Sequence, residues 1–96
     1  MIAEINNNIF VINKSDISVK LNKLNKRIFN YILKLNNKII YIGYSSNIYL
    51  RLIQHKGTKD FNKIILLEFN NKKDARLMEK KLIKEYQPKH NYQYKN

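Results

Sequence analysis

The stretch IIYIGYSSNIYLRLIQHKG, residues 39–57, decides how this chain is interpreted. A short apolar run reaches Gly43, a polar turn follows, and a helical pattern then continues to Gly57. Arg51 and His55 are four residues apart, so on a helix they lie one above the other, beside Leu52 and near the side that faces a sheet. A plainer alternative is an exposed arginine and a surface histidine on the same helix. The pattern predicts a strand, a turn capped by Ser46 or Asn47, and a helix that ends with a left-handed Gly57.

Working outward, the remaining segments alternate between strand and helix patterns. Asn36-Asn37 suits a tight hairpin turn between two strands, Asn70 or Asn71 can cap a final helix, and Pro88 stops it. The fold class that we expect is α+β, a small antiparallel three-stranded sheet flanked by helices, with an N-terminal strand and a basic amphipathic helix. The expected elements are a strand at 8–13, a helix from Ser15 or Asp16 with Ile17, Leu21, Leu24 and Ile28 on one face, strands at 30–35, 38–43 and 61–69, and a helix at 72–86.

Length and composition limit the possible classes of protein. The chain has 96 residues, room for one small domain, in which we expect residues 1–28 to be an extension of the domain formed by residues 29–96. Without cysteine there can be no disulfide, thiolate zinc site or cysteine nucleophile. No run reaches the roughly 18 apolar residues of a membrane span, and Glu4 interrupts any secretion-signal pattern. We therefore expect an intracellular, cytoplasmic protein with no membrane partner.

The chain is strongly basic. Its net charge is +12 and its isoelectric point is near 10.0, which indicates a polyanionic partner, most commonly nucleic acid. An alternative is compositional, because a chain so rich in Lys, Asn and Ile acquires positive charge without a binding role. Lysine supplies most of the 19 basic residues, so each of the three arginines, Arg27, Arg51 and Arg76, raises the question of whether a planar, bidentate group is needed.

One carboxylate lies where an apolar side chain is expected. Glu79 falls within the apolar stripe of the last helix, between Ala75 and Ile83. A carboxylate on such a face needs either an ion-pair partner, such as Arg51 or a lysine, or a bound cation. One carboxylate completed by water and phosphate oxygens is a typical Mg²⁺ site, so both interpretations stay open.

These residues together resemble the GIY-YIG nuclease family, named after two strand tripeptides about ten residues apart. Tyr41-Ile42-Gly43 is the second tripeptide unaltered, and Asn30-Tyr31-Ile32 is a changed form of the first that keeps a tyrosine. A polar turn, an arginine, a histidine four residues later, a glutamate on a later helix and an asparagine after a proline follow in the family's order, here as Arg51, His55, Glu79 and Asn91.

The resemblance implies a metal-dependent DNA endonuclease. It implies that Glu79 holds one Mg²⁺ or Mn²⁺, that Arg51 clamps a phosphate oxygen, and that Tyr41, with Tyr31 beside it, acts as a general base or orients water. It also implies that His55 accepts the proton and that Asn91 positions water or phosphate. Further contacts with the DNA backbone are expected from basic residues of several elements, namely Lys56, Lys59, Lys63, Arg76, Lys23, Lys26 and Arg27.

Other interpretations remain open. The altered first tripeptide favours a nucleic-acid-binding module without catalysis, and a basic RNA-associated protein with a chance match is a third reading. A homodimer through Ile17, Leu21 and Leu24 of the N-terminal helix is also compatible with the pattern.

Overall fold

Strands and helices follow one another in an α+β order, which confirms the expected fold class. The computed structural model describes residues 2–6 and 8–91, with side chains from residue 8 onward, so the expected domain end at residue 96 lies outside the described residues. The elements are β1 (Ile2–Asn6), β2 (Ile9–Asn13), the 3₁₀ helices η1 (Lys14–Asp16) and η2 (Val19–Leu24), β3 (Ile28–Leu35), β4 (Lys38–Ser45), α1 (Ile48–Lys56), β5 (Lys63–Phe69) and α2 (Lys72–Tyr86).

The sheet is larger than expected. Within the described residues it has five antiparallel strands rather than three, in the order β1-β2-β5-β3-β4. The N-terminal strand β2 pairs with the free edge of β5, where Ile12 lies opposite Ile64, and β1 then extends the sheet as a hairpin with β2. Pairing satisfies backbone groups that would otherwise be left open at the edge of β5.

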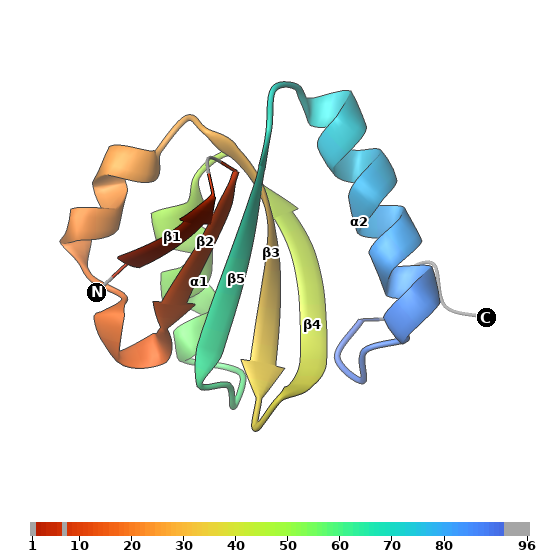
Figure 1. Ribbon diagram of the computed structural model, residues 1–96. Coiled ribbons are helices and arrows are strands. Elements are labelled where there is room, and N and C mark those ends of the chain that lie inside the picture. The colour runs from red at the N-terminus through yellow and green to blue at the C-terminus, as the bar shows by residue number, and fades with distance from the viewer. Residues whose placement is uncertain (1, 7, 92–96) are drawn as a thin grey trace.

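The sheet is covered on both faces (Figure 1). On one face, the larger core joins α1, η2 and Ile17 to strand side chains such as Phe29, Leu33 and Ile64. On the other face, α2 packs on β3, β4 and β5 through a smaller cluster around Ile32, Ile42 and Ile83. A carboxylate on α2 and an arginine on α1 therefore come from opposite layers, so a site that uses both must form where the layers approach each other.

The N-terminal helix predicted from the apolar spacing is wrong in type. The segment forms two short 3₁₀ helices separated by Ile17 and Ser18, whose backbones are extended. The Ser18 hydroxyl accepts a hydrogen bond from the Lys20 backbone N–H, a local bond that competes with helix continuation. Ile17, Leu21 and Leu24 are nevertheless buried, in the core of this same chain, and so offer no apolar face for the expected dimer contact.

The two α-helices match their predictions. Helix α1 spans Ile48–Lys56, and α2 begins after Asn71, whose side chain accepts a hydrogen bond from the Asp74 backbone N–H. The expected left-handed conformation of Gly57 is wrong, because Gly57 has φ −84° and ψ −11°. In the described part of the chain, no helix is long and apolar enough to cross a bilayer.

The packing leads us to infer that residues 14–24 are an integral part of the domain, and paired substitutions in η2 test this. Leu21→Ala removes a side chain with no exposed surface and should cost about 2–5 kcal/mol of unfolding free energy. Val19→Ala, at a position that is 66% exposed, should change it by less than about 0.5 kcal/mol. Urea denaturation measures both, and equal, small effects would mean that the segment is a dispensable extension.

Candidate active site

The phenol of Tyr31 lies across the backbone of Gly43. These residues face each other in the β3–β4 pairing. A Cβ atom built on Gly43 would come within 2.3 Å of both the Cζ and the hydroxyl of Tyr31, a distance that real Cβ contacts do not show. A glycine is therefore needed at this position so that the ring of Tyr31 can cross strand β4, and its hydroxyl lies over the edge strand of the sheet.

A β-bulge turns Tyr41 toward the same side. Leu33 pairs with Tyr41, but Lys34 pairs with Ile39, so Ile40 is an extra residue in β4. Strict alternation would place Ile40 and Tyr41 on opposite faces, whereas both contact the larger core. The bulge thus brings the second tyrosine of the resemblance to the face that carries the first.

His55 completes a buried aromatic cluster with these tyrosines. Its Nε2 lies 2.8 Å from the Tyr31 hydroxyl, and its ring centroid is 4.8 Å from that of Tyr41 and 5.3 Å from that of Tyr31. The Nζ of Lys59 lies 4.8 Å from the centroid of the Tyr41 ring, a cation–π contact. The sequence predicted Lys59 only as a contact to the DNA backbone. Its place against Tyr41 was missed, because no local pattern carries it.

Burial fixes the protonation of the Tyr31–His55 pair. It raises the pKa of Tyr31, and the negative charge that Tyr41 can carry acts in the same direction, while Arg51 partly opposes them. Burial also lowers the pKa of His55 to about 4, assisted by the positive charges of Lys59 and Arg51. At neutral pH the Tyr31 phenol is therefore protonated and the His55 imidazole is neutral. The tautomer of His55 determines which of the two donates the hydrogen bond.

Glu79 and Arg51 both act on this cluster from opposite layers. Glu79 lies half-buried on α2, and Arg51 lies exposed on α1. The pKa of Tyr31 is lowered by the guanidinium of Arg51 and raised by the carboxylate of Glu79, so both charges are near its hydroxyl. Burial raises the pKa of Glu79, and only the cation of Arg76 opposes that shift. The structure therefore brings the predicted arginine, glutamate and tyrosines to one edge of the sheet.

Asn91 bonds to the backbone of the edge strand. Its Oδ1 accepts from the Ile42 N–H and its Nδ2 donates to the Ile42 carbonyl, each at 2.8 Å. The neighbouring His90 N–H donates to the Ile40 carbonyl at 3.1 Å. With both amide atoms engaged in this way, Asn91 holds the Tyr41-Ile42-Gly43 strand in place from its outer edge.

The other basic residues predicted to contact DNA lie in different settings. Arg76 stacks on Tyr44, with 5.3 Å between the guanidinium carbon and the ring centroid, next to Glu79. Arg27 pairs with Glu68 through bonds of 2.7 and 2.5 Å, so its guanidinium is committed to this ion pair. Exposed positions are held by Lys23, Lys26, Lys56 and Lys63.

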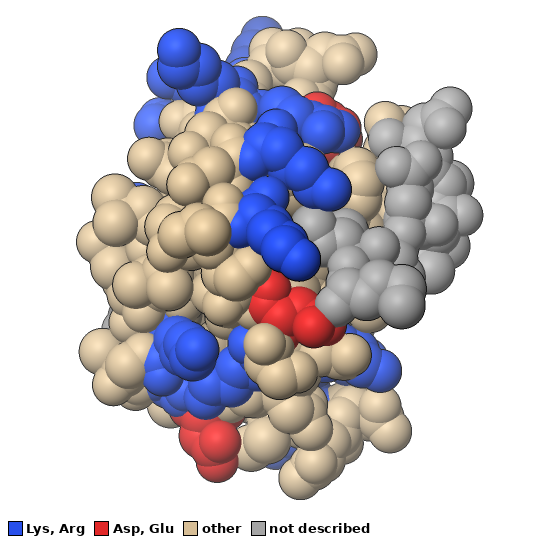
Figure 2. Space-filling view, turned by 90° about the vertical axis from the view of Figure 1, so that its left-hand side faces the viewer, with Lys and Arg blue, Asp and Glu red and all other residues tan. Residues whose placement is uncertain are grey.

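The surface charge is spread rather than gathered into one stripe. Figure 2 shows Lys and Arg side chains in separate groups on one face of the molecule, with a few acidic side chains and much uncharged surface between them. A polyanion on such a surface meets several separate cationic points.

Asn30 is a further polar residue that the sequence did not single out. Its side chain is fully buried on the α2 face of β3, opposite Tyr44, and neither amide atom has a hydrogen-bond partner among the described residues. Nothing in the pattern NYILKL distinguishes it from an ordinary strand residue, because its burial depends on α2.

The donor set suits one kind of metal site. No group of three or more His, Asp or Glu side chains that could hold a metal occurs in the part of the chain that the structure describes. A cation here would therefore have Glu79 as its carboxylate ligand and complete its shell with water and substrate oxygens. This is a pattern that Mg²⁺ accepts and a structural Zn²⁺ site does not. A half-buried carboxylate with a raised pKa is one that a nearby cation would stabilise in its charged form.

Comparisons with known proteins agree with this geometry. The chain matches the GIY-YIG catalytic domain family over residues 25–93, which is more than half of its length, so the chain belongs to that family. The resemblance inferred from the sequence is confirmed. Tyr31, the tyrosine of the altered first tripeptide, pairs with Gly43, the last residue of the second tripeptide.

Two curated relatives are each named UvrABC system protein C. The one from Mycoplasmoides gallisepticum is 43% identical over 57% of this chain, and the one from Fusobacterium nucleatum is 38% identical over 64%. This chain covers only 11% and 12% of their respective lengths, so it corresponds to a small part of each.

Solved structures give the same fold. The GIY-YIG N-terminal endonuclease domain of UvrC from Thermotoga maritima, bound to magnesium as its catalytic divalent cation, matches with a TM-score of 0.65 and 25% identity, covering 79% of this chain and 96% of that domain. A point variant of that domain matches with the same TM-score at 23% identity, covering 80% of this chain and 96% of the variant, which supports the fold alone. The enzyme class expected from the sequence, an endonuclease, agrees with these findings.

Substituting each of the two glycines tests the close contact at Gly43. Gly43→Ala should displace the ring of Tyr31 and cost about 1–3 kcal/mol of unfolding free energy. Gly57→Ala is the control, because its added Cβ would lie 3.9 Å from the nearest atom at a negative φ, and it should be neutral or stabilise by up to about 1 kcal/mol. Thermal and urea denaturation compare them, and equal stabilities would contradict the crossing of Tyr31 over Gly43.

The lowered pKa of His55 predicts how stability depends on pH. Between the ordinary pKa of 6.5 and about 4, the unfolded chain binds a proton at His55 that the folded chain does not. Stability from the neutral, buried imidazole is thus complete above pH 6.5 and is lost as the pH falls toward 4. We expect denaturation midpoints of the parent chain to fall across this window, and those of His55→Gln to fall less steeply. Parallel curves for the two would show that His55 titrates normally in the fold.

Proposed function

We propose that this chain is a metal-dependent DNA endonuclease that hydrolyses phosphodiester bonds with a single divalent cation, Mg²⁺ or Mn²⁺. The observation that carries the proposal is the convergence of Glu79 and Arg51, from opposite layers, on the buried hydrogen bond between Tyr31 and His55. A binding surface has no need of a carboxylate beside phosphate, since it would repel the ligand, whereas a metal-assisted nuclease requires one. The magnesium bound by the similar domain supports the choice of cation.

Each residue would have a separate role in phosphodiester hydrolysis, which follows from its charge and position. Arg51, exposed at the edge of the cluster, would bind a non-bridging phosphate oxygen through its planar guanidinium. Tyr31, protonated and hydrogen-bonded to Nε2, would hold the imidazole ring of His55 in place. Asn91 and Gly43 would keep the edge strand in register, so that Tyr41 stays next to His55.

Tyr41 remains the best candidate to orient or deprotonate the attacking water. Its ring is only partly buried, and the ammonium group of Lys59 lies over the face of that ring. Because Tyr31 lies buried with a raised pKa, it is unsuited to that role. His55 has too low a pKa to hold a proton in the free protein, but a bound phosphate dianion or diester would raise that pKa and make it a better acceptor.

A divalent cation held by Glu79 would stabilise the negative charge on the scissile phosphate and on the leaving oxygen. For the protein side of the site, the consequence is that Glu79 must be ionised. Because burial raises its pKa, activity should fall on the acid side sooner than for an exposed glutamate.

A non-catalytic nucleic-acid-binding module is the second candidate. Two observations favour it: the first tripeptide lacks the family's glycine, and Glu79 belongs to no group of three or more potential metal-binding side chains within the described residues. Plasmid cleavage separates the two candidates, since only the endonuclease should cut in Mg²⁺ and stop when a chelator is added.

Two glutamates on the same helix provide a direct test of the proposal. Glu79→Gln should lower the rate of plasmid cleavage in Mg²⁺ by about 100-fold or more while DNA binding in a chelator persists. Glu85→Gln removes the same charge from an exposed position on α2 and should cut at the parent rate. Gel assays of supercoiled plasmid measure cutting, and fluorescence anisotropy measures binding. Cleavage by Glu79→Gln at the parent rate would refute the assignment of the metal ligand.

A further inference from the structure

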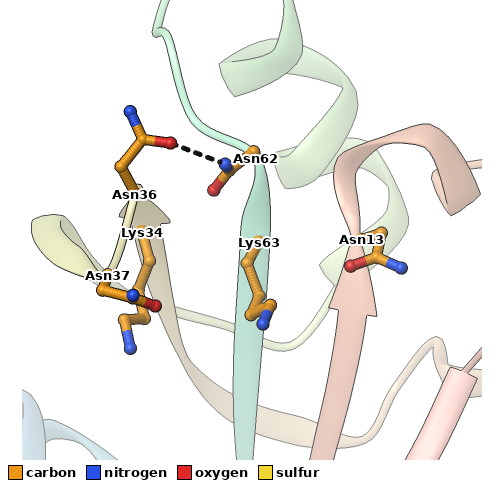
Figure 3. Close-up of a pocket in the computed structure, with 6 residues that line it drawn as sticks. All are labelled: Asn13, Lys34, Asn36, Asn37, Asn62 and Lys63. Carbon is orange, nitrogen blue, oxygen red and sulfur yellow. Dashed lines mark hydrogen bonds between the residues drawn. The ribbon is translucent and has the colours of Figure 1, made fainter.

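A second basic site lies on the face of the sheet opposite the one that carries the aromatic cluster. It is a pocket of about 370 Å³ at the ends of β2 and β3, at the β3–β4 turn and at the start of β5. Figure 3 shows its residues, with the side chains of Lys34 and Lys63 extending in the same direction from adjacent strands. The lining consists of two lysines and four asparagines, namely Lys34, Lys63, Asn13, Asn36, Asn37 and Asn62.

The two lysines are in an unfavourable position for the free protein. Lys34 lies directly opposite Lys63 in the β3–β5 pairing, and Asn13 lies opposite Lys63 in the β2–β5 pairing. Residues that face each other in this way share one face of the sheet with Cβ atoms about 5 Å apart, and like charges at such positions destabilise the sheet. No carboxylate lines the pocket to offset their repulsion. An anion bound between the two lysines would offset that repulsion.

The asparagines give the pocket its shape and its hydrogen-bonding groups. Asn36 and Asn37 form the β3–β4 turn with φ of 50° and 71°, the left-handed conformation that asparagine tolerates better than most residues. The Nδ2 of Asn62 donates to the Oδ1 of Asn36 at 3.3 Å, and the Asn62 backbone N–H donates to the Lys34 carbonyl at 2.8 Å. These bonds tie the loop before β5 to the turn, so the lining is held by both backbone and side chains.

We propose that this pocket binds a phosphate group of a nucleic-acid backbone, and this inference rests on the proposed function. Two ammonium groups and several amide N–H donors around a small polar hollow suit a phosphate, which is an acceptor on every side. The pocket differs from the catalytic cluster in position and in face. Lys34 follows Tyr31 by three residues, which places it about 10 Å further along β3 on the opposite side of the sheet.

Its role would be to fix the path of the strand, not to take part in cleavage. A phosphate held here, together with one held at Arg51, would anchor the nucleic acid at two points around the edge of the sheet. Such contacts raise affinity without conferring sequence preference.

Charge-matched double variants test this proposal. Lys34→Gln/Lys63→Gln and the control Lys20→Gln/Lys84→Gln remove the same net charge, and the two control lysines are exposed on η2 and α2. Anisotropy with a fluorescent DNA duplex, in a chelator to prevent cutting, measures affinity across a range of salt concentrations. We expect the pocket variant to lose about tenfold or more in affinity and its salt slope to fall by about 2, while the control loses less than about threefold. Equal losses in the two variants would overturn the proposal.

A second measurement identifies the chemical group and guards against misfolding. Inorganic phosphate should raise the melting temperature of the parent chain by more than that of the pocket variant, which keeps only the proposed phosphate contact at Arg51, because binding stabilises the folded state. In low salt without phosphate, the pocket variant should melt no lower than the parent, since a repulsive pair has been removed. If phosphate stabilises both chains equally, or if DNA affinity is unchanged while phosphate still binds, the nucleic-acid site is refuted.

These outcomes separate this inference from the proposed function. If the parent chain neither binds nor cuts DNA, the proposed function and the phosphate-binding pocket are both refuted. If the parent cuts in Mg²⁺ and the pocket variant binds and cuts equally well, only the phosphate-binding pocket is refuted.

Discussion

The crossing of Tyr31 over Gly43 is the constraint on which the site depends. A buried phenol that crosses an edge strand needs a residue without a side chain beneath it, and its hydroxyl then needs a partner in a place with little water. His55 supplies that partner at 2.8 Å, which requires α1 to lie at a fixed height against the sheet. The turn after β4 and the start of α1 are therefore set by a packing requirement, and the position of Arg51, one helical turn before His55, follows from it.

The bulge in β4 and the hydrogen bonds of Asn91 restrain the edge strand that carries Tyr41 and Gly43. An edge strand is the part of a sheet most free to slip or fray. Here the extra residue Ile40 fixes the local register, and the two hydrogen bonds from Asn91 to Ile42 occupy the outer edge of the strand. Tyr41, the proposed water-orienting tyrosine, thus lies on a strand that is restrained along both edges. A site that forms between two layers needs such restraint, because both layers pack on the same sheet.

Local patterns were enough to predict the two α-helices, the β3–β4 hairpin and the α+β class, since each depends on spacing, caps and turn residues close together in the chain. They failed where a distant partner decides the outcome. The strand β2 joins the sheet because β5 has a free edge, and Leu21 and Leu24 are buried in 3₁₀ geometry because Ser18 interrupts the helix. Arg27 could be singled out by its rarity, but its partner Glu68, 41 residues away, could not be found.

The candidate catalytic residues could be identified from the sequence for a different reason, namely that their order along the chain matches a family. Spacing alone put Arg51 and His55 on one face, and the apolar stripe of α2 marked Glu79 as unusual. Neither the spacing nor the apolar stripe indicated that α1 and α2 lie on opposite faces of the sheet. That arrangement has a chemical consequence. Arg51 and Glu79 act on the same phenol from opposite layers and are not neighbours on one helix. This arrangement agrees with our proposal that the arginine binds phosphate and the glutamate binds a cation.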